Sequence, residues 1–189
     1  MAGQTPNPPG EGDGEPPAAA APVHRGPPIV IAEEVLDERG ERTARLLAQV
    51  VGPHAQESGG RDDLPWAVVA PENLLEVARK CRNSSELALD MLHLQFAVDY
   101  EDHIQMVYVL FSMSLDRKAI LRVNLPAENP TVDSVSGLWE AASWYERETH
   151  DLFGVEFAGN PDLSPLLLFD GFEGHPGLKS YPFNDYQEW

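Results

Sequence analysis

The sequence is poor in the residues that hold redox metals and disulfides. Its one cysteine, Cys81, cannot form an intrachain disulfide or supply the set of thiolates that an iron–sulfur cluster usually needs. The six histidines are scattered, with no His-x-x-x-His pair and no cysteine partner. We therefore expect no metal and no cofactor in this chain, and we expect Cys81 to be a small packed residue on a helix.

Basic residues are scarce as well. The chain has 13 Lys and Arg against 31 Asp and Glu, which gives a formal net charge of −18. Nucleic-acid binding requires a clustered basic surface, and adsorption to an anionic membrane requires the same, so this composition argues against both. An acidic surface is compatible with solubility and with basic protein partners.

Long apolar runs are missing too. No stretch reaches the roughly 20 apolar residues of a membrane-spanning helix. The longest apolar-rich segment, 104–115, is interrupted by Gln105, Ser112 and Ser114. The N-terminus has no basic region followed by an apolar core, so we expect no secretory signal. These observations predict a cytoplasmic chain that reaches a membrane only through its partners.

Proline is concentrated at the N-terminus, where eight of the 17 prolines lie within residues 1–28. Glycine and alanine fill much of the rest, and so little apolar surface cannot offset the entropy lost on ordering the chain. Residues 1–28 are therefore predicted to be a disordered tail. The alternative is a proline-rich recognition segment.

Residues 29–154 predict an α+β domain. Apolar spacing predicts helices at 33–51, 71–82 and 131–151, the last with Thr131 as its N-cap. Alternating apolar residues predict strands at 66–70, 92–100, 104–115 and 119–125. Gly59-Gly60 and Asp62-Asp63 predict a turn before the first strand, and the short later linkers indicate antiparallel hairpins. The expected sheet is mixed and largely antiparallel, with about four strands packed against helices and the strand at 104–115 covered on both faces.

The C-terminal segment, 155–189, combines many glycines and prolines with a series of large apolar side chains. We refer to these residues as the strap. The composition predicts a long irregular segment, and an apolar segment without regular structure needs a surface to lie on. We therefore expect the strap to dock on partner subunits.

The end of the last predicted helix carries an unusual stripe. Helical spacing places Glu140, Trp144, Arg147 and Asp151 on one face, with Glu148 beside them. A solvated charged face is one interpretation. Tryptophan and arginine are common interface anchors, which favours a partner surface instead. A carboxylate cluster for acid–base chemistry is a further alternative, but Arg147 among the carboxylates favours a network of ion pairs.

The same region resembles a known family. Residues 146–155, ERETHDLFGV, resemble the ERE-x-x-DLFG-hydrophobic signature of the C-type subunit of complex I, the NADH:quinone oxidoreductase. Residues 157–163 resemble its F-x-GHPDL continuation, with Asn160 in place of histidine, and residues 174–182 resemble its GHPLRKDYP ending. Ser164, Pro165 and Leu178 stand where basic residues are common in that family. The resemblance covers residues 65–183.

The resemblance implies a structural, non-redox subunit of the peripheral arm of a proton-translocating dehydrogenase, on the cytoplasmic side of the bacterial cell membrane. It implies packing against the D-type subunit, which helps to form the quinone pocket, with the B-type subunit also a partner. It further implies that FMN, iron–sulfur clusters, NADH and quinone are bound by other chains. A homologous subunit of a membrane-bound hydrogenase and a free-standing binding domain are the alternatives. The signature positions form the candidate partner interface: Trp144, Glu146, Arg147, Glu148, Asp151, Leu152, Phe153, Gly154, Pro161, Asp162, Leu163, Gly174, His175, Pro176, Lys179, Tyr181 and Pro182.

Overall fold

The computed structural model describes residues 34–182, so the predicted tail at 1–28 and the last residues of the strap lie outside the described part. The elements follow in the order α1 (Glu38–Val51), the 3-10 helix η1 (Gly52–His54), β1 (Ala55–Arg61), β2 (Leu64–Val69), the 3-10 helix η2 (Pro71–Asn73), α2 (Leu74–Asn83), β3 (Met91–Asp99), β4 (His103–Ser112), β5 (Arg117–Pro126), β6 (Thr131–Asp133), α3 (Ala142–Phe153) and β7 (Glu156–Ala158).

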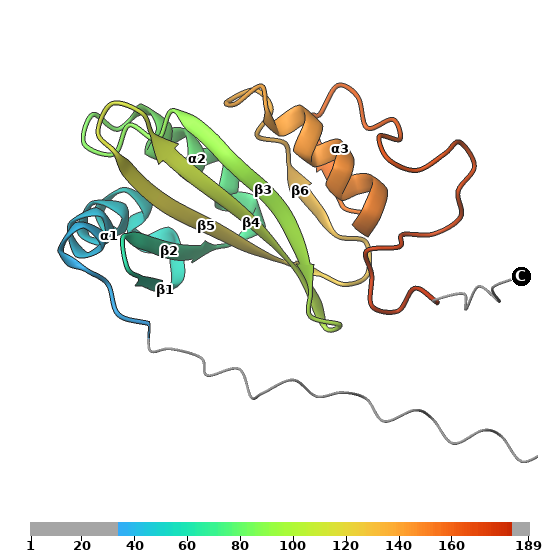
Figure 1. Cartoon of the computed structure of the whole chain (residues 1–189), viewed down its shortest axis with the longest axis horizontal. Coiled ribbons are helices and arrows are strands. Elements are labelled where there is room, and N and C mark those ends of the chain that lie inside the picture. The colour runs from blue at the N-terminus through green and yellow to red at the C-terminus, as the bar shows by residue number, and fades with distance from the viewer. Residues whose placement is uncertain (1–33, 183–189) are drawn as a thin grey trace, which may run out of the picture. The chain divides into compact units, whose positions relative to one another are not determined.

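A mixed sheet organises these elements (Figure 1). Its strand order is β1-β2-β5-β4-β3, and β6 and β7 form a separate parallel pair. The β1–β2, β3–β4 and β4–β5 pairs are antiparallel, whereas β2 and β5 are parallel. The expected α+β class, the largely antiparallel sheet and the hairpins at its centre are therefore confirmed.

The main sheet has five strands rather than four, because the predicted turn at Gly59-Gly60 is wrong. Both glycines lie in β1, opposite Trp66 and Pro65 of β2, and the chain turns at Asp62 and Asp63 instead. A Cβ atom on Gly59 would lie 2.5 Å from the Trp66 ring. The glycine thus permits close packing of an aromatic side chain across the strand pair, and that long-range reason is not visible in the local sequence.

The helix predicted from Thr131 is also wrong in its first half. Thr131 is not an N-cap but the first residue of β6, paired with Glu156 of β7, and α3 begins only at Ala142. Glu140 consequently lies outside the helix. Val132, Val135 and Trp139 are buried as expected, yet they reach the core from a strand and a turn. Strand pairing with β7, more than twenty residues later in the chain, therefore decides the structure here, although the local spacing of apolar residues is helical.

The core lies between the helices and one face of the sheet. Ile104, Met106, Tyr108 and Leu110 of β4 are almost completely buried in it. The other face of β4 is less covered than predicted, since Val109 and Phe111 remain partly exposed. Cys81 of α2 is fully buried, and desolvation raises the pKa of its thiol to about 12, which confirms its role as a packed residue.

Within residues 34–182, no helix has both the length and the apolar character needed to cross a bilayer.

Helix α1 is fixed to the β1–β2 turn through Gly40. Replacing Gly40 with alanine would place a Cβ atom 2.2 Å from the Asp62 carbonyl oxygen. Alanine would gain about 0.5–1 kcal/mol of helix propensity, but overpacking against backbone costs about 1–3 kcal/mol. We expect Gly40→Ala to lower the free energy of unfolding by about 1–2 kcal/mol, measured by urea denaturation.

Gly137→Ala is the matched control, because no atom lies within 4 Å of its added Cβ. Its free energy of unfolding should change by less than about 0.5 kcal/mol. Equal stability of the two variants would contradict the packing described for Gly40.

Candidate functional site

Two side chains of α3 hold the backbone of the strap. The Arg147 side chain donates from Nε to the Ser164 carbonyl and from Nη2 to the Pro165 carbonyl, each at 3.0 Å. One helical turn later, Asp151 Oδ2 accepts hydrogen bonds from three successive amides, those of residues 166, 167 and 168, at 3.1, 2.8 and 2.8 Å. A cation thus binds carbonyls and an anion binds amides along one continuous segment.

The amides favour the charged form of Asp151. Burial opposes ionisation of this side chain, but the three amide hydrogen bonds and the nearby His150 outweigh it, so the pKa of Asp151 lies below its ordinary value. Hydrogen bonds to an ionised acceptor are roughly twice as strong as neutral ones. The charged carboxylate is therefore the form that fixes the strap.

The ion-pair network expected around Arg147 is not observed. Among the described residues, the ion pairs do not include Arg147, because its donors are directed to the strap carbonyls. Its guanidinium carbon lies 5.2 Å from the centre of the Trp144 ring, which positions that ring beside the strap. Glu148, on the same helix, is exposed.

Glu146 is fully buried and joins α3 to two other segments. Its Oε1 accepts from the Val135 amide at 2.8 Å, and its Oε2 accepts from Ser134 Oγ and Asn160 Nδ2, each at 2.7 Å. Desolvation raises the pKa of Glu146, although these hydrogen bonds oppose the shift. Asn160, which replaces a histidine of the family pattern, thus supplies a hydrogen bond between the strap and the helix.

The two distant parts of the signature contact each other at the end of α3. Gly154 ends the helix with φ +72°, and a Cβ there would lie 2.7 Å from the His175 ring. His175 Nδ1 is 3.0 Å from the Asp151 carbonyl oxygen, and the Gly177 amide donates to the Leu152 carbonyl at 2.8 Å. Glycine at 177 is needed, because a Cβ would lie 2.8 Å from that carbonyl oxygen.

The remaining predicted site residues are distributed along the strap. Asp162 accepts from the Ser164 amide at 2.9 Å, and Leu163 packs against the core. The Lys179 amide donates to Asp99 at 2.8 Å, which ties the strap to the end of β3. Tyr181 stacks on Phe172 with ring centroids 6.0 Å apart. Pro161, Gly174 and Pro182 are exposed, whereas Phe153 and Pro176 are partly buried. The strap is not wholly irregular, because it contains β7.

Three large apolar side chains beside these contacts face solvent. The exposed fraction is 61% for Trp144, 60% for Leu167 and 71% for Phe169. The backbone that carries Leu167 is held by Asp151, and Phe169 packs edge-to-face on Phe172 with centroids 5.3 Å apart. We call Trp144, Leu167 and Phe169 the apolar triad.

No metal centre is evident in the described range, 34–182. No group of three or more His, Cys, Asp or Glu side chains is placed to hold a metal ion there. A cavity of about 470 Å³ between α1 and the β1–β2 pair is lined mainly by apolar side chains.

A family model described as respiratory-chain NADH dehydrogenase, 30 Kd subunit, matches residues 67–187. The chain belongs to this 30 Kd subunit family.

Related members of the 30 Kd subunit family are found in several bacteria. The C-type subunit of the NADH-quinone oxidoreductase of Roseiflexus castenholzii is 37% identical over 142 residues, which are 74% of this chain and 81% of that protein. Its counterpart in Roseiflexus sp. RS-1 is 39% identical over 117 residues, or 60% of this chain and 67% of the relative. The resemblance to the C-type subunit of complex I is therefore confirmed.

Solved structures support the 30 Kd subunit fold. A trypsin-resistant fragment of Nqo5 has a TM-score of 0.54 and 28% identity, covering 65% of this chain and 99% of the fragment. A chain from the membrane-bound sulfane sulfur reductase, described as an archaeal respiratory membrane complex, has a TM-score of 0.63 and 26% identity. The matched region covers 77% of this chain and 86% of the reductase chain.

Removing the charge of Asp151 should loosen the strap. Asp151→Asn keeps the shape but loses the charge-assisted bonds to three amides, for an expected loss of roughly 2 kcal/mol of local stability. That equals a roughly thirtyfold rise in the open population. Chymotryptic cleavage between 166 and 169, followed by mass spectrometry, should accelerate accordingly. Glu148→Gln, which neutralises an exposed carboxylate of the same helix, should cleave at the wild-type rate; a matching acceleration there would contradict the assignment.

The pH dependence of strap binding follows from the lowered pKa of Asp151. A carboxyl group whose pKa is lowered by folding stabilises the fold at pH values above its unfolded-state pKa of about 3.9, and this contribution disappears as the pH falls through the folded-state pKa. In an NMR titration, the Asp151 carboxyl carbon should titrate below about 3.9, and the amides of 166–168 should shift at the same midpoint. A midpoint above the ordinary value would show that the amides do not bind the anion.

Proposed function

We propose that this chain is a structural, non-redox subunit of the peripheral arm of a proton-translocating NADH:quinone oxidoreductase. In this proposal, α3 and its bound strap pack against the D-type subunit near the quinone site, and the B-type homologue is a second neighbour. Membership of the 30 Kd subunit family supports the assignment of this chain to such a complex. The contact surface is inferred from the geometry of α3.

The observation that carries the proposal is the apolar triad on a rigid support. Large exposed apolar groups are unfavourable in water but are typical anchors of protein interfaces. Trp144 is held beside Arg147, and the backbone of Leu167 is fixed by Asp151. Because these anchors are already ordered, binding a partner costs little additional conformational entropy.

The redox groups belong, in this proposal, to other subunits. The single thiol of Cys81 is buried and protonated at neutral pH, so it is a poor ligand for iron. FMN, the iron–sulfur clusters, NADH and quinone would be held by neighbouring chains. The role of this protein is then to maintain the geometry of its neighbours, on the cytoplasmic side of the membrane and without crossing it.

A second candidate is the equivalent subunit of a complex-I-like assembly without NADH oxidation, such as a membrane-bound hydrogenase. The match to a chain of the archaeal membrane-bound sulfane sulfur reductase favours it. The co-purifying subunits distinguish the two candidates. NADH- and FMN-binding chains would support the first, and their absence from an intact assembly would support the second.

The proposed interface can be tested in the native host. We expect Trp144→Ser and Phe169→Ser in an affinity-tagged chain to reduce co-purification of the D-type subunit about tenfold or more, because each removes a large apolar anchor. Quantitative mass spectrometry of the native assembly measures this ratio. The thermal midpoint of each isolated variant should stay near that of the wild type, since both side chains are exposed.

Met113→Ser is the matched control. Met113 is 67% exposed and lies on the β4–β5 turn, away from the triad. The Met113→Ser variant should leave the recovery of the D-type partner unchanged. Full recovery of that partner with both triad variants would rule out this surface as the interface.

A further inference from the structure

A cavity lined by basic residues lies where the first half of α1 meets the β1–β2 and β4–β5 turns. Its volume is about 330 Å³. Four basic side chains line it, together with two aspartates, a threonine and a leucine: Arg39, Arg42, Arg117, Lys118, Asp63, Asp116, Thr43 and Leu115.

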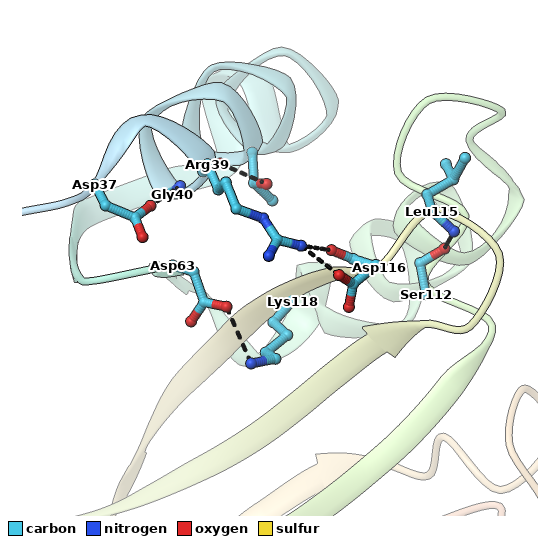
Figure 2. A network of polar contacts seen from close by, with 9 residues as sticks. Asp37, Arg39, Gly40, Asp63, Ser112, Leu115, Asp116 and Lys118 are labelled. Carbon is cyan, nitrogen blue, oxygen red and sulfur yellow. Dashed lines mark hydrogen bonds and ion pairs between the residues drawn. The ribbon is translucent and has the colours of Figure 1, made fainter.

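Two of the four cations already have carboxylate partners. Arg39 pairs with Asp116 and also donates to its carbonyl oxygen at 3.0 Å, and Lys118 Nζ lies 3.0 Å from Asp63 Oδ2 (Figure 2). These two pairs join three separate segments of the chain around the cavity. They fix its walls and leave the charges of the other two cations uncompensated.

Arg42 and Arg117 are the two remaining cations. Neither takes part in an ion pair among residues 34–182. Nη1 of Arg117 is buried and makes no hydrogen bond within that range. Because Nη1 is closed to solvent, a ligand does not reach this donor directly. Both arginines nevertheless line the cavity, so an anion bound there lies close to their uncompensated charges.

Basic residues are concentrated at this cavity although the chain is strongly acidic. Four of its 13 basic residues surround one cavity, although the net charge of the chain is −18. Four cations against two carboxylates leave two positive charges on the walls. A concave surface concentrates such a field, so the cavity attracts anions that the rest of the surface repels.

We propose that this cavity binds the carboxylate side chains of an acidic segment from a neighbouring polypeptide. An arginine guanidinium presents parallel N–H donors that match a carboxylate in a bidentate geometry. Phosphate is the other common ligand of arginine clusters, and it usually also binds free amides at the start of a helix. Here the Asp37 carboxylate already accepts from the Gly40 amide at 2.7 Å, so this amide at the start of α1 is not free to bind a phosphate.

This surface is separate from the apolar triad and goes beyond the proposed function. The family model begins at residue 67, so Arg39, Arg42 and Asp63 lie outside the matched region. The cavity therefore adds a second contact, selected by charge, to the apolar contact at α3. Its test requires no knowledge of the assembly, so its outcome is independent of the proposal for α3.

The test uses the full chain and a hexaglutamate peptide as the probe. Addition of the peptide should shift the side-chain Nε–H resonances of Arg42 and Arg117 in a saturable manner, and added salt should weaken the binding. Arg42→Glu should lower the affinity by about tenfold or more, because it replaces an attraction by a repulsion. Arg42 is exposed, so this variant should fold normally.

Arg79→Glu is the matched control, since Arg79 is an exposed cation on α2 outside the cavity. It makes the same change in net charge and should leave the affinity within about twofold. Equal losses in both variants would mean that net charge alone drives binding, which overturns the proposal. Absence of shifts at millimolar peptide overturns it as well. Inorganic phosphate that binds more tightly than the peptide would assign a phosphate site instead.

Discussion

The structure of the C-terminal half depends on two opposite charges placed one turn apart on α3. Arg147 binds carbonyl groups of the strap and Asp151 binds its amides, so the strap gains hydrogen bonds that no strand or helix of its own supplies. This allows a segment rich in glycine and proline to follow a defined path. Buried Glu146 adds a second connection, from the helix to the β6 loop and to Asn160.

This arrangement changes the meaning of the family signature. The charged residues at 146, 147 and 151 would ordinarily be assigned to partner contacts, yet their polar groups are used within the chain. The glycines at 154 and 177 allow the later part of the signature to lie against the end of α3. The large apolar side chains of the triad, Trp144, Leu167 and Phe169, remain exposed. The charged residues organise the surface, and the apolar residues are proposed to make the contact.

Local patterns in the sequence predicted those elements whose partners are close along the chain. Alternation and short linkers indicated the β3–β4–β5 meander, and helical spacing indicated α2. Strand β1 was missed because its sequence, AQESGGR, has no apolar alternation and is fixed by packing against Trp66. Strand β6 was missed because its partner is β7. The signature marked residues of α3 and the strap that contact each other, but helical spacing cannot show that Arg147 faces carbonyls of the strap, the first of them seventeen residues later, rather than nearby carboxylates.

Hydrogen exchange of the full chain, alone and in the purified assembly, tests the central claim most directly. If Asp151 holds the strap, the amides of 166–168 exchange slowly in the isolated chain, and assembly changes their protection little. Assembly should instead slow hydrogen exchange only at the backbone amides around Trp144 and Phe169. Fast exchange of 166–168 in the isolated chain, with protection gained only in the assembly, would show that a partner rather than α3 orders the strap.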